Sequence, residues 1–195
     1  NVRADVICKS FIGDKFAFLF LGSLYPLKGI DILLKAFAKL SPTSNWVLVL
    51  VGDDRFKNKY VHMADTLGIR DKVLFRGTLK SCIVGSVLKL ANVLILPSRY
   101  KDGWGVVLNE AASMGLALIA SDRVGAAFHL IEPSGNGFRV KAGDVESLER
   151  AMSAYVNNPY LAKIHGGYSL DIFERFMPEP NAKRFIDAIR SWESM

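Results

Sequence analysis

Short, almost wholly apolar runs recur along this chain, and stretches of helical length separate them. The runs lie at 16–21, 46–51, 73–75, 93–96 and 117–120. Strands that are apolar at every position, rather than at alternate positions, are typical of parallel sheets covered on both faces. Parallel strands also need a crossover connection, which is usually a helix. The alternation therefore predicts an α/β fold with a Rossmann-like, doubly wound parallel sheet.

The stretches between these runs have the character of helices. In residues 28–40, the apolar residues Ile30, Leu33, Leu34 and Phe37 fall on one helical face. We expect further helices at 57–67, 81–90 and 105–114, and extra C-terminal helices at 145–156, 160–173 and 181–192. In a doubly wound fold the ligand binds outside the carboxyl ends of the strands. The residues that follow each apolar run are therefore the candidates for a site.

The chain has 195 residues, enough for one domain of this kind. Residues 1–15 have no strong pattern, and we interpret them as an arm or the remnant of an interdomain linker. Residues 16–195 would form the single ligand-binding domain. Because the sequence starts at Asn1 and not at Met, we expect a fragment that lacks its natural N-terminal part. No apolar run approaches the roughly 20 residues needed to span a bilayer.

Positive charge is concentrated in the first part of the chain. The net charge is +6, and residues 1–101 hold 16 Lys and Arg against 7 Asp and Glu. This excess suits an anionic partner such as a nucleotide diphosphate, a lipid phosphate or a membrane surface, or it is simply solvated. No basic run with interleaved aromatic residues is present, so the sequence disfavours a nucleic-acid partner. The Gly-x-Gly-x-x-Gly fingerprint and the P-loop motif are also absent, which argues against an NAD-dependent dehydrogenase and a P-loop ATPase.

Residues 97–111 contain the densest group of candidate functional side chains. Asp102 and Glu110 lie eight residues apart, and Gly103-Trp104-Gly105 lies between them. We expect a helix to start near Trp104 or Gly105, with its free N–H groups directed at a ligand above the loop. Glycine allows a ligand to approach the main chain closely. Two carboxylates, a glycine turn and a helix start together predict a nucleotide-sugar site.

This segment resembles the acidic motif of glycosyltransferase family 4, whose members are retaining enzymes of the GT-B fold. The family has Glu, seven residues and a second Glu, with Gly-Phe-Gly after the first; here these positions are Asp102, Gly103-Trp104-Gly105 and Glu110. Other segments resemble the family in the same order over residues 16–157, and they lie at 22–29, 73–77, 121–125, 135–138 and 143–144. The resemblance implies the C-terminal half of a GT-B glycosyltransferase.

The resemblance also implies a role for each matching residue. Lys28 and Asp102 would be the catalytic residues, with Lys28 paired to a donor phosphate and Asp102 contacting hydroxyls of the donor sugar. Glu110 would receive the ribose hydroxyls, and its apolar neighbours predict that it is partly buried. The other substrate-binding residues would be Gly22, Ser23, Arg76, Gly103, Trp104 and Gly105. The family needs no metal and no cofactor, because the nucleotide diphosphate sugar is a substrate.

Two positions depart from the family pattern. Ser23 stands where the family usually has a phosphate-binding Arg, and a serine carries no charge. Another cation could substitute, with Arg99, Lys101 and Arg123 as the candidates. Asp102 is shorter than Glu by one methylene, and it could instead cap the next helix.

Several aromatic and basic residues have two possible positions. Trp104 could wall the pocket or pack in the core, and Arg76 could stack on the base or lie in solvent. His129 could touch the donor or be structural. We interpret His62 and His165 as surface residues.

The sequence thus predicts the donor-binding domain of a retaining hexosyltransferase. An N-terminal domain absent from this chain would hold most of the acceptor, so the fragment alone would transfer sugar poorly. The alternatives are a non-catalytic nucleotide-sugar-binding module and a GT-B sugar-nucleotide epimerase. We expect a cytoplasmic protein, with peripheral contact to the inner membrane face if the acceptor is an anionic lipid.

Overall fold

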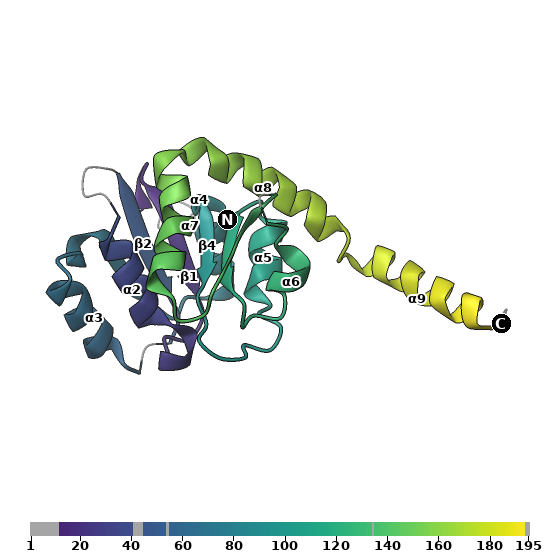
Figure 1. Ribbon diagram of the computed structural model, residues 1–195, viewed down its shortest axis with the longest axis horizontal. Coiled ribbons are helices and arrows are strands. Elements are labelled where there is room, and N and C mark those ends of the chain that lie inside the picture. Colours follow the sequence, from purple (N-terminus) through teal and green to yellow (C-terminus); the bar gives the residue numbers. More distant parts are fainter. Residues whose placement is uncertain (1–11, 41–44, 54, 134, 194–195) are drawn as a thin grey trace.

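A computed structural model describes residues 12–40, 45–53, 55–133 and 135–193. Its centre is a six-stranded parallel sheet of order β3-β2-β1-β4-β5-β6 (Figure 1). The strands are β1 (Phe16–Leu21), β2 (Trp46–Val51), β3 (Val73–Gly77), β4 (Val93–Leu96), β5 (Ala117–Ser121) and β6 (Gly137–Val140). Because the chain runs outward from β1 to β3 and then returns to β4, the order reverses between β1 and β4. The doubly wound fold predicted from the sequence is confirmed.

Helices cover both faces of this sheet. The helices are α2 (Ile30–Ala38), α3 (Lys57–Thr66), α4 (Ser81–Leu90), α5 (Val107–Ser113), α6 (Ala127–Leu130), α7 (Val145–Asn157), α8 (Pro159–Glu174) and α9 (Pro178–Glu193). Helix α2 packs on α3 and α7, whereas α5 packs on α6 and α8. Right-handed crossovers place α2 and α3 on the face opposite α4 and α5. Every residue of β2, β4 and β5 is buried, which explains why these strands are apolar except at Ser121, the last residue of β5.

Two helices begin later than the sequence predicts, and each has a glycine at its start. Residues 26–28 form a 3-10 turn, and α2 begins only after Gly29, whose φ is 72°. Helix α5 begins at Val107, after Gly105 with a φ of 82°. A left-handed residue cannot continue a right-handed helix, so both glycines separate a loop from the helix that follows. The short strand β6 and the helix α6 were missed by the sequence analysis.

The two ends of the described chain differ in how far they are buried. Of the predicted arm, residues 1–11 lie outside the described residues, and Ile12 is buried in the core with 1% of its surface exposed. At the other end, α9 extends away from the rest of the molecule (Figure 1). Its large apolar side chains are exposed, with 69% for Phe185 and 77% for Trp192. Among the described residues, no helix combines the length and apolar character needed to cross a membrane.

Candidate functional site

The loops that follow β1, β4 and β5 meet at the carboxyl edge of the sheet. A Cβ on Gly29 would lie 2.2 Å from the carbonyl oxygen of Pro97, so only glycine allows this contact between the β1 and β4 loops. The N–H of Arg99 donates to the carbonyl of Leu27 at 2.9 Å across the same contact. On the other side, the N–H of Asp102 donates to the carbonyl of Arg123 in the β5 loop at 3.0 Å. Segments far apart in sequence therefore form one site where the strand order reverses.

Lys28 and Asp102, the two predicted catalytic residues, contact each other directly. The ammonium of Lys28 donates to Oδ1 of Asp102 in an ion pair. The side chain of Lys28 is 29% exposed and that of Asp102 is 13% exposed. The hydroxyl of Ser98 donates to the other carboxylate oxygen, Oδ2, at 2.5 Å. Asp102 does not cap the next helix, because the N-cap position of α5 is Val106 and has no side-chain cap.

The carbonyl groups of the glycine turn after Asp102 are hydrogen-bonded to the loop that follows β5. The carbonyls of Gly103 and Trp104 accept hydrogen bonds from the N–H groups of Gly125 and Ala126, at 3.0 and 2.7 Å. By contrast, within the described part of the chain the N–H groups of Gly103 and Gly105 have no hydrogen-bond partner. No bond within the described residues occupies these two N–H groups, and their binding to a ligand stays a prediction.

Trp104 lies at the surface, so the core-packing alternative is wrong. It is 42% exposed, and its indole N–H donates to Oδ1 of Asn109 at 2.7 Å. The ring of His129 stacks on it with a centroid distance of 5.3 Å and an interplanar angle of 27°. The Trp104 ring thus lies at the surface between Asn109 of α5 and His129 of α6, and its contact with a ligand stays a prediction.

Glu110 is exposed, which corrects the prediction that it is partly buried. In α5 the buried residues are Leu108, Ala111 and Ala112, and Glu110 projects from the other side of the helix. It lines a groove of about 460 Å³ between α4 and α5, together with Leu21 at the end of β1. The groove wall from α4 consists of Ser81, Val84, Gly85 and Leu88. The groove therefore has a carboxylate beside a largely apolar wall.

The β1 loop offers fewer donors than the resemblance implies. The N–H of Gly22 is already bonded to the carbonyl of Val51 at 2.9 Å, so it is not available to a phosphate. The N–H of Ser23, in contrast, has no partner among the residues the structure describes. The side chain of Arg76 at the end of β3 is exposed. Ser23 and Lys28 are thus the possible phosphate donors of this loop.

The cations proposed to replace the family arginine differ in their partners. Arg99 forms an ion pair with Asp31 at the start of α2. Arg123 lies 3.7 Å from the carboxylate of its neighbour Asp122. Lys101 is exposed in the loop before Asp102. Two of the three candidates therefore have a carboxylate partner of their own.

The two histidines predicted to lie at the surface differ in their exposure to solvent. His62 is exposed, but His165 is 3% exposed, so its assignment to the surface was wrong. Its Nδ1 lies 2.8 Å from the hydroxyl of Tyr155, and burial lowers the pKa of the imidazole. Burial likewise raises the pKa of the Tyr155 hydroxyl. Tyr155 belongs to α7 and His165 to α8, so their buried contact joins these two helices in the core.

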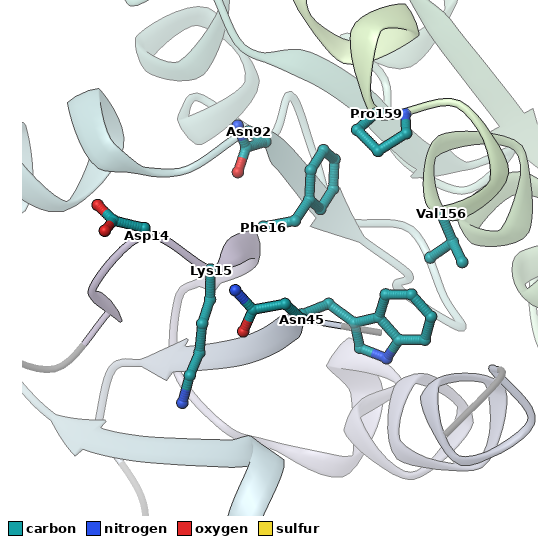
Figure 2. Close-up of a pocket in the computed structure, with 8 residues that line it drawn as sticks. Asp14, Lys15, Phe16, Asn45, Asn92, Val156 and Pro159 are labelled. Atoms are coloured by element: carbon teal, nitrogen blue, oxygen red, sulfur yellow. The ribbon is translucent and has the colours of Figure 1, made fainter. Parts of the chain in front are cut away.

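A second cavity of about 380 Å³ lies at the opposite, amino-terminal edge of the sheet. Figure 2 shows Phe16, Asn92, Val156 and Pro159 around it, with Asp14 and Lys15 at its rim. The Oδ1 of Asn92 accepts the N–H of Ala17 at 2.7 Å, so this side chain secures the start of β1. No motif residue lines this cavity. In the described residues, no group of three or more His, Cys, Asp or Glu is arranged to hold a metal ion.

Sequence reasoning missed Ser98, which directly contacts Asp102. Ser98 is 1% exposed, and its position between Pro97 and Arg99 carries no periodic signal. It is the second residue after a buried strand that ends at the carboxyl edge, and that position was the available indication.

Comparison with known proteins identifies the fold and the family of this chain. The six-stranded parallel sheet flanked by helices matches the C-terminal Rossmann-like domains of GT-B glycosyltransferases. Residues 6–168 match the family model of glycosyl transferases group 1, and the chain belongs to this family.

The individual relatives share between about a fifth and a third of their aligned residues with this chain. The chain is 26% identical over 181 residues to an uncharacterized glycosyltransferase, MJ1607, of Methanocaldococcus jannaschii, covering 91% of this chain and 45% of that protein. It is 32% identical over 151 residues to the lipopolysaccharide core biosynthesis mannosyltransferase LpcC of Rhizobium leguminosarum, covering 73% and 41%. The Anabaena protein HepE, solved with UDP and glucose, superposes with a TM-score of 0.83 at 20% identity over 98% of this chain and 53% of that one. The chain thus spans about half the length of each of these three proteins.

Proposed function

We propose that this chain is the donor-binding domain of a retaining glycosyltransferase of family 4. The full protein would move a sugar from a nucleotide diphosphate sugar to an acceptor held mainly by an N-terminal domain outside this chain. The observation that carries the proposal is the meeting of Lys28, Asp102 and the free N–H groups of Gly103 and Gly105 where the strand order reverses. Each group was singled out from sequence for donor recognition, and the fold brings them together.

The arrangement suggests how the residues divide the donor between them. Lys28 has three N–H donors, one of which goes to Asp102. The other two can bind oxygens of the leaving diphosphate, and the N–H groups of Ser23, Gly103 and Gly105 can add to them. Charge that develops on the leaving group would then be stabilised by groups already in place. Asp102 would contact hydroxyls of the donor sugar, and Glu110 would bind the ribose beside the α4–α5 groove.

No separate catalytic base is needed on this domain. In the mechanism that the resemblance implies, the leaving phosphate itself takes the proton of the acceptor hydroxyl. We propose that the reaction requires no metal, so the same donor affinity is expected with and without EDTA. A site that bound the donor only with Mg²⁺ or Mn²⁺ would contradict this assignment.

Calorimetric titration with UDP-, GDP- and ADP-sugars tests donor binding. UDP-glucose is the first probe because the structurally similar HepE was also solved with it. Lys28→Ala should weaken binding of the preferred donor by about 1.5–3 kcal/mol, the usual value of a hydrogen bond to a charged group. Lys39→Ala is the matched control: Lys39 pairs with Glu146 on the α2–α7 side, away from the site. Equal affinities for the parent and Lys28→Ala would place the phosphate elsewhere.

Glu110→Gln tests the nucleoside end of the site separately. The variant keeps the shape of the side chain but replaces one acceptor oxygen with a donor. Because Glu110 is exposed, folding should not change, whereas nucleotide affinity should fall by about 1–3 kcal/mol. UDP alone is the ligand to use, since it lacks the sugar that Asp102 would bind. Unchanged affinity for UDP would remove Glu110 from the site.

A non-catalytic nucleotide-sugar-binding module is the second candidate. It is favoured by Ser23, which supplies no charge, and by the pairing of Lys28 with Asp102, which leaves little net positive charge. Binding titrations cannot separate the two candidates. Sugar transfer by the full-length protein would decide for the enzyme, and donor binding without transfer or hydrolysis would decide for the module.

A further inference from the structure

Ser98 occupies a buried position directly beneath the candidate catalytic pair. It is the second residue after β4, and its hydroxyl donates to Oδ2 of Asp102 at 2.5 Å. Its carbonyl accepts a hydrogen bond from the hydroxyl of Ser121, at the end of β5, at 2.6 Å. Ser121 is itself fully buried and also accepts the N–H of Arg123 at 3.3 Å. The backbone of Ser98 is therefore fixed by two adjacent strands of the sheet.

Asp102 lies four residues further along the same loop, next to the Gly103-Trp104-Gly105 turn. Its carboxylate uses its two oxygens separately, Oδ1 for Lys28 and Oδ2 for Ser98. The contact with Ser98 connects this carboxylate to a buried residue close to the end of β4. Since Ser98 is neutral, it orients the carboxylate without competing with Lys28 for charge.

We propose that Ser98 is a positioning residue, which orients the carboxylate of Asp102 and, through it, the ammonium of Lys28 for the donor. Asp102 is one methylene shorter than the glutamate of related enzymes, so its reach depends on how it is held. Without Ser98, the carboxylate can turn both oxygens toward Lys28, and the ammonium is then less available to a phosphate. This role rests on the proposed function, because it presumes that a nucleotide sugar binds here.

A double-mutant cycle on UDP-glucose affinity tests the proposal. Ser98→Ala alone should weaken binding about tenfold or more, as expected when a hydrogen bond to a charged group is lost. In an Asp102→Asn background, Ser98→Ala should change affinity less than twofold, because the charge that it orients is gone. A purely structural serine would give the same loss in both backgrounds.

Two further measurements keep the result interpretable. Ser86→Ala removes another buried serine hydroxyl, on α4 and away from Asp102, and should leave UDP-glucose affinity unchanged. The unfolding midpoint of each variant without ligand shows whether the domain stays folded. Equal losses of UDP-glucose affinity in the two backgrounds, or no loss for Ser98→Ala, would overturn the role of Ser98 and leave the proposed function standing. If the folded parent bound none of the UDP-, GDP- and ADP-sugars, the proposed function and this inference would both be overturned.

Discussion

The two glycines of the turn after Asp102 should respond very differently to the same substitution. Gly105 has a φ of 82°, and a Cβ on it would lie 2.5 Å from Cγ1 of Val124 and 3.3 Å from Cδ2 of Leu96. Gly103 has a φ of 50°, but a Cβ there would meet no atom within 4 Å. Both substitutions incur the left-handed penalty of about 1–2 kcal/mol. Only Gly105→Ala adds overpacking of the core, which typically costs about 1–3 kcal/mol.

We therefore expect Gly105→Ala to lower the free energy of unfolding by about 2–5 kcal/mol, and Gly103→Ala by only about 1–2 kcal/mol. Urea denaturation of the two variants beside the parent measures both values. Adding Val124→Ala to Gly105→Ala removes the clashing methyl, so the pair should be less destabilised than the sum of its single changes. Equal destabilisation by the two glycine variants, or strict additivity with Val124→Ala, would refute this account of the turn.

Three other outcomes follow from the structure. Burial lowers the pKa of His165 below its ordinary 6.5, so the unfolded chain takes up a proton at a higher pH than the folded protein does. The free energy of unfolding should therefore fall as the pH drops below 6.5. Unfolding titrations of the parent and of His165→Asn should show a smaller loss of stability in the variant. Removal of residues 178–195 should change the free energy of unfolding of the remaining domain by less than about 1 kcal/mol, because α9 is largely exposed. A large drop in the melting temperature would mean that α9 packs on that domain. Ser23→Arg should tighten UDP binding by about 1–2 kcal/mol if the phosphate lies beside the β1 loop, and weaker binding would show that another cation already fills that place.

The sheet was predictable because its central strands are buried on both faces. Residues 16–21, 46–51 and 93–96 are apolar at every position, and the observed strands have the same bounds. The edge strand β6 escaped the same reasoning, since Phe138 is half-buried and Arg139 is exposed. An edge strand of only four residues that includes an exposed arginine gives no continuous apolar run.

The errors at individual residues have a common physical origin in helix geometry. Leu108, Ala111 and Ala112 surround Glu110 in sequence, but they form the buried face of α5 and direct Glu110 outward. His165 shows the reverse case, because it shares the buried face of α8 with Ala162, Ser169 and Ile172. Neighbours in sequence do not share an environment on a helix, whereas residues three and four apart do. The burial of His165 could have been read from that spacing, had small and polar residues been counted as part of the face.

Motif spacing identified Lys28 and Asp102 but could not reveal that they pair, and this pairing changes the electrostatics of the site. Arg99 and Arg123 also have carboxylate partners, Asp31 and Asp122. A diphosphate that binds here must therefore exchange partners with carboxylates that already neutralise these cations. Salt weakens both the cation–carboxylate pair that is broken and the cation–phosphate pair that is formed. The salt dependence of donor binding should accordingly be shallower than the number of cations at this edge suggests, and the uncharged N–H donors of Ser23, Gly103 and Gly105 should account for more of the affinity.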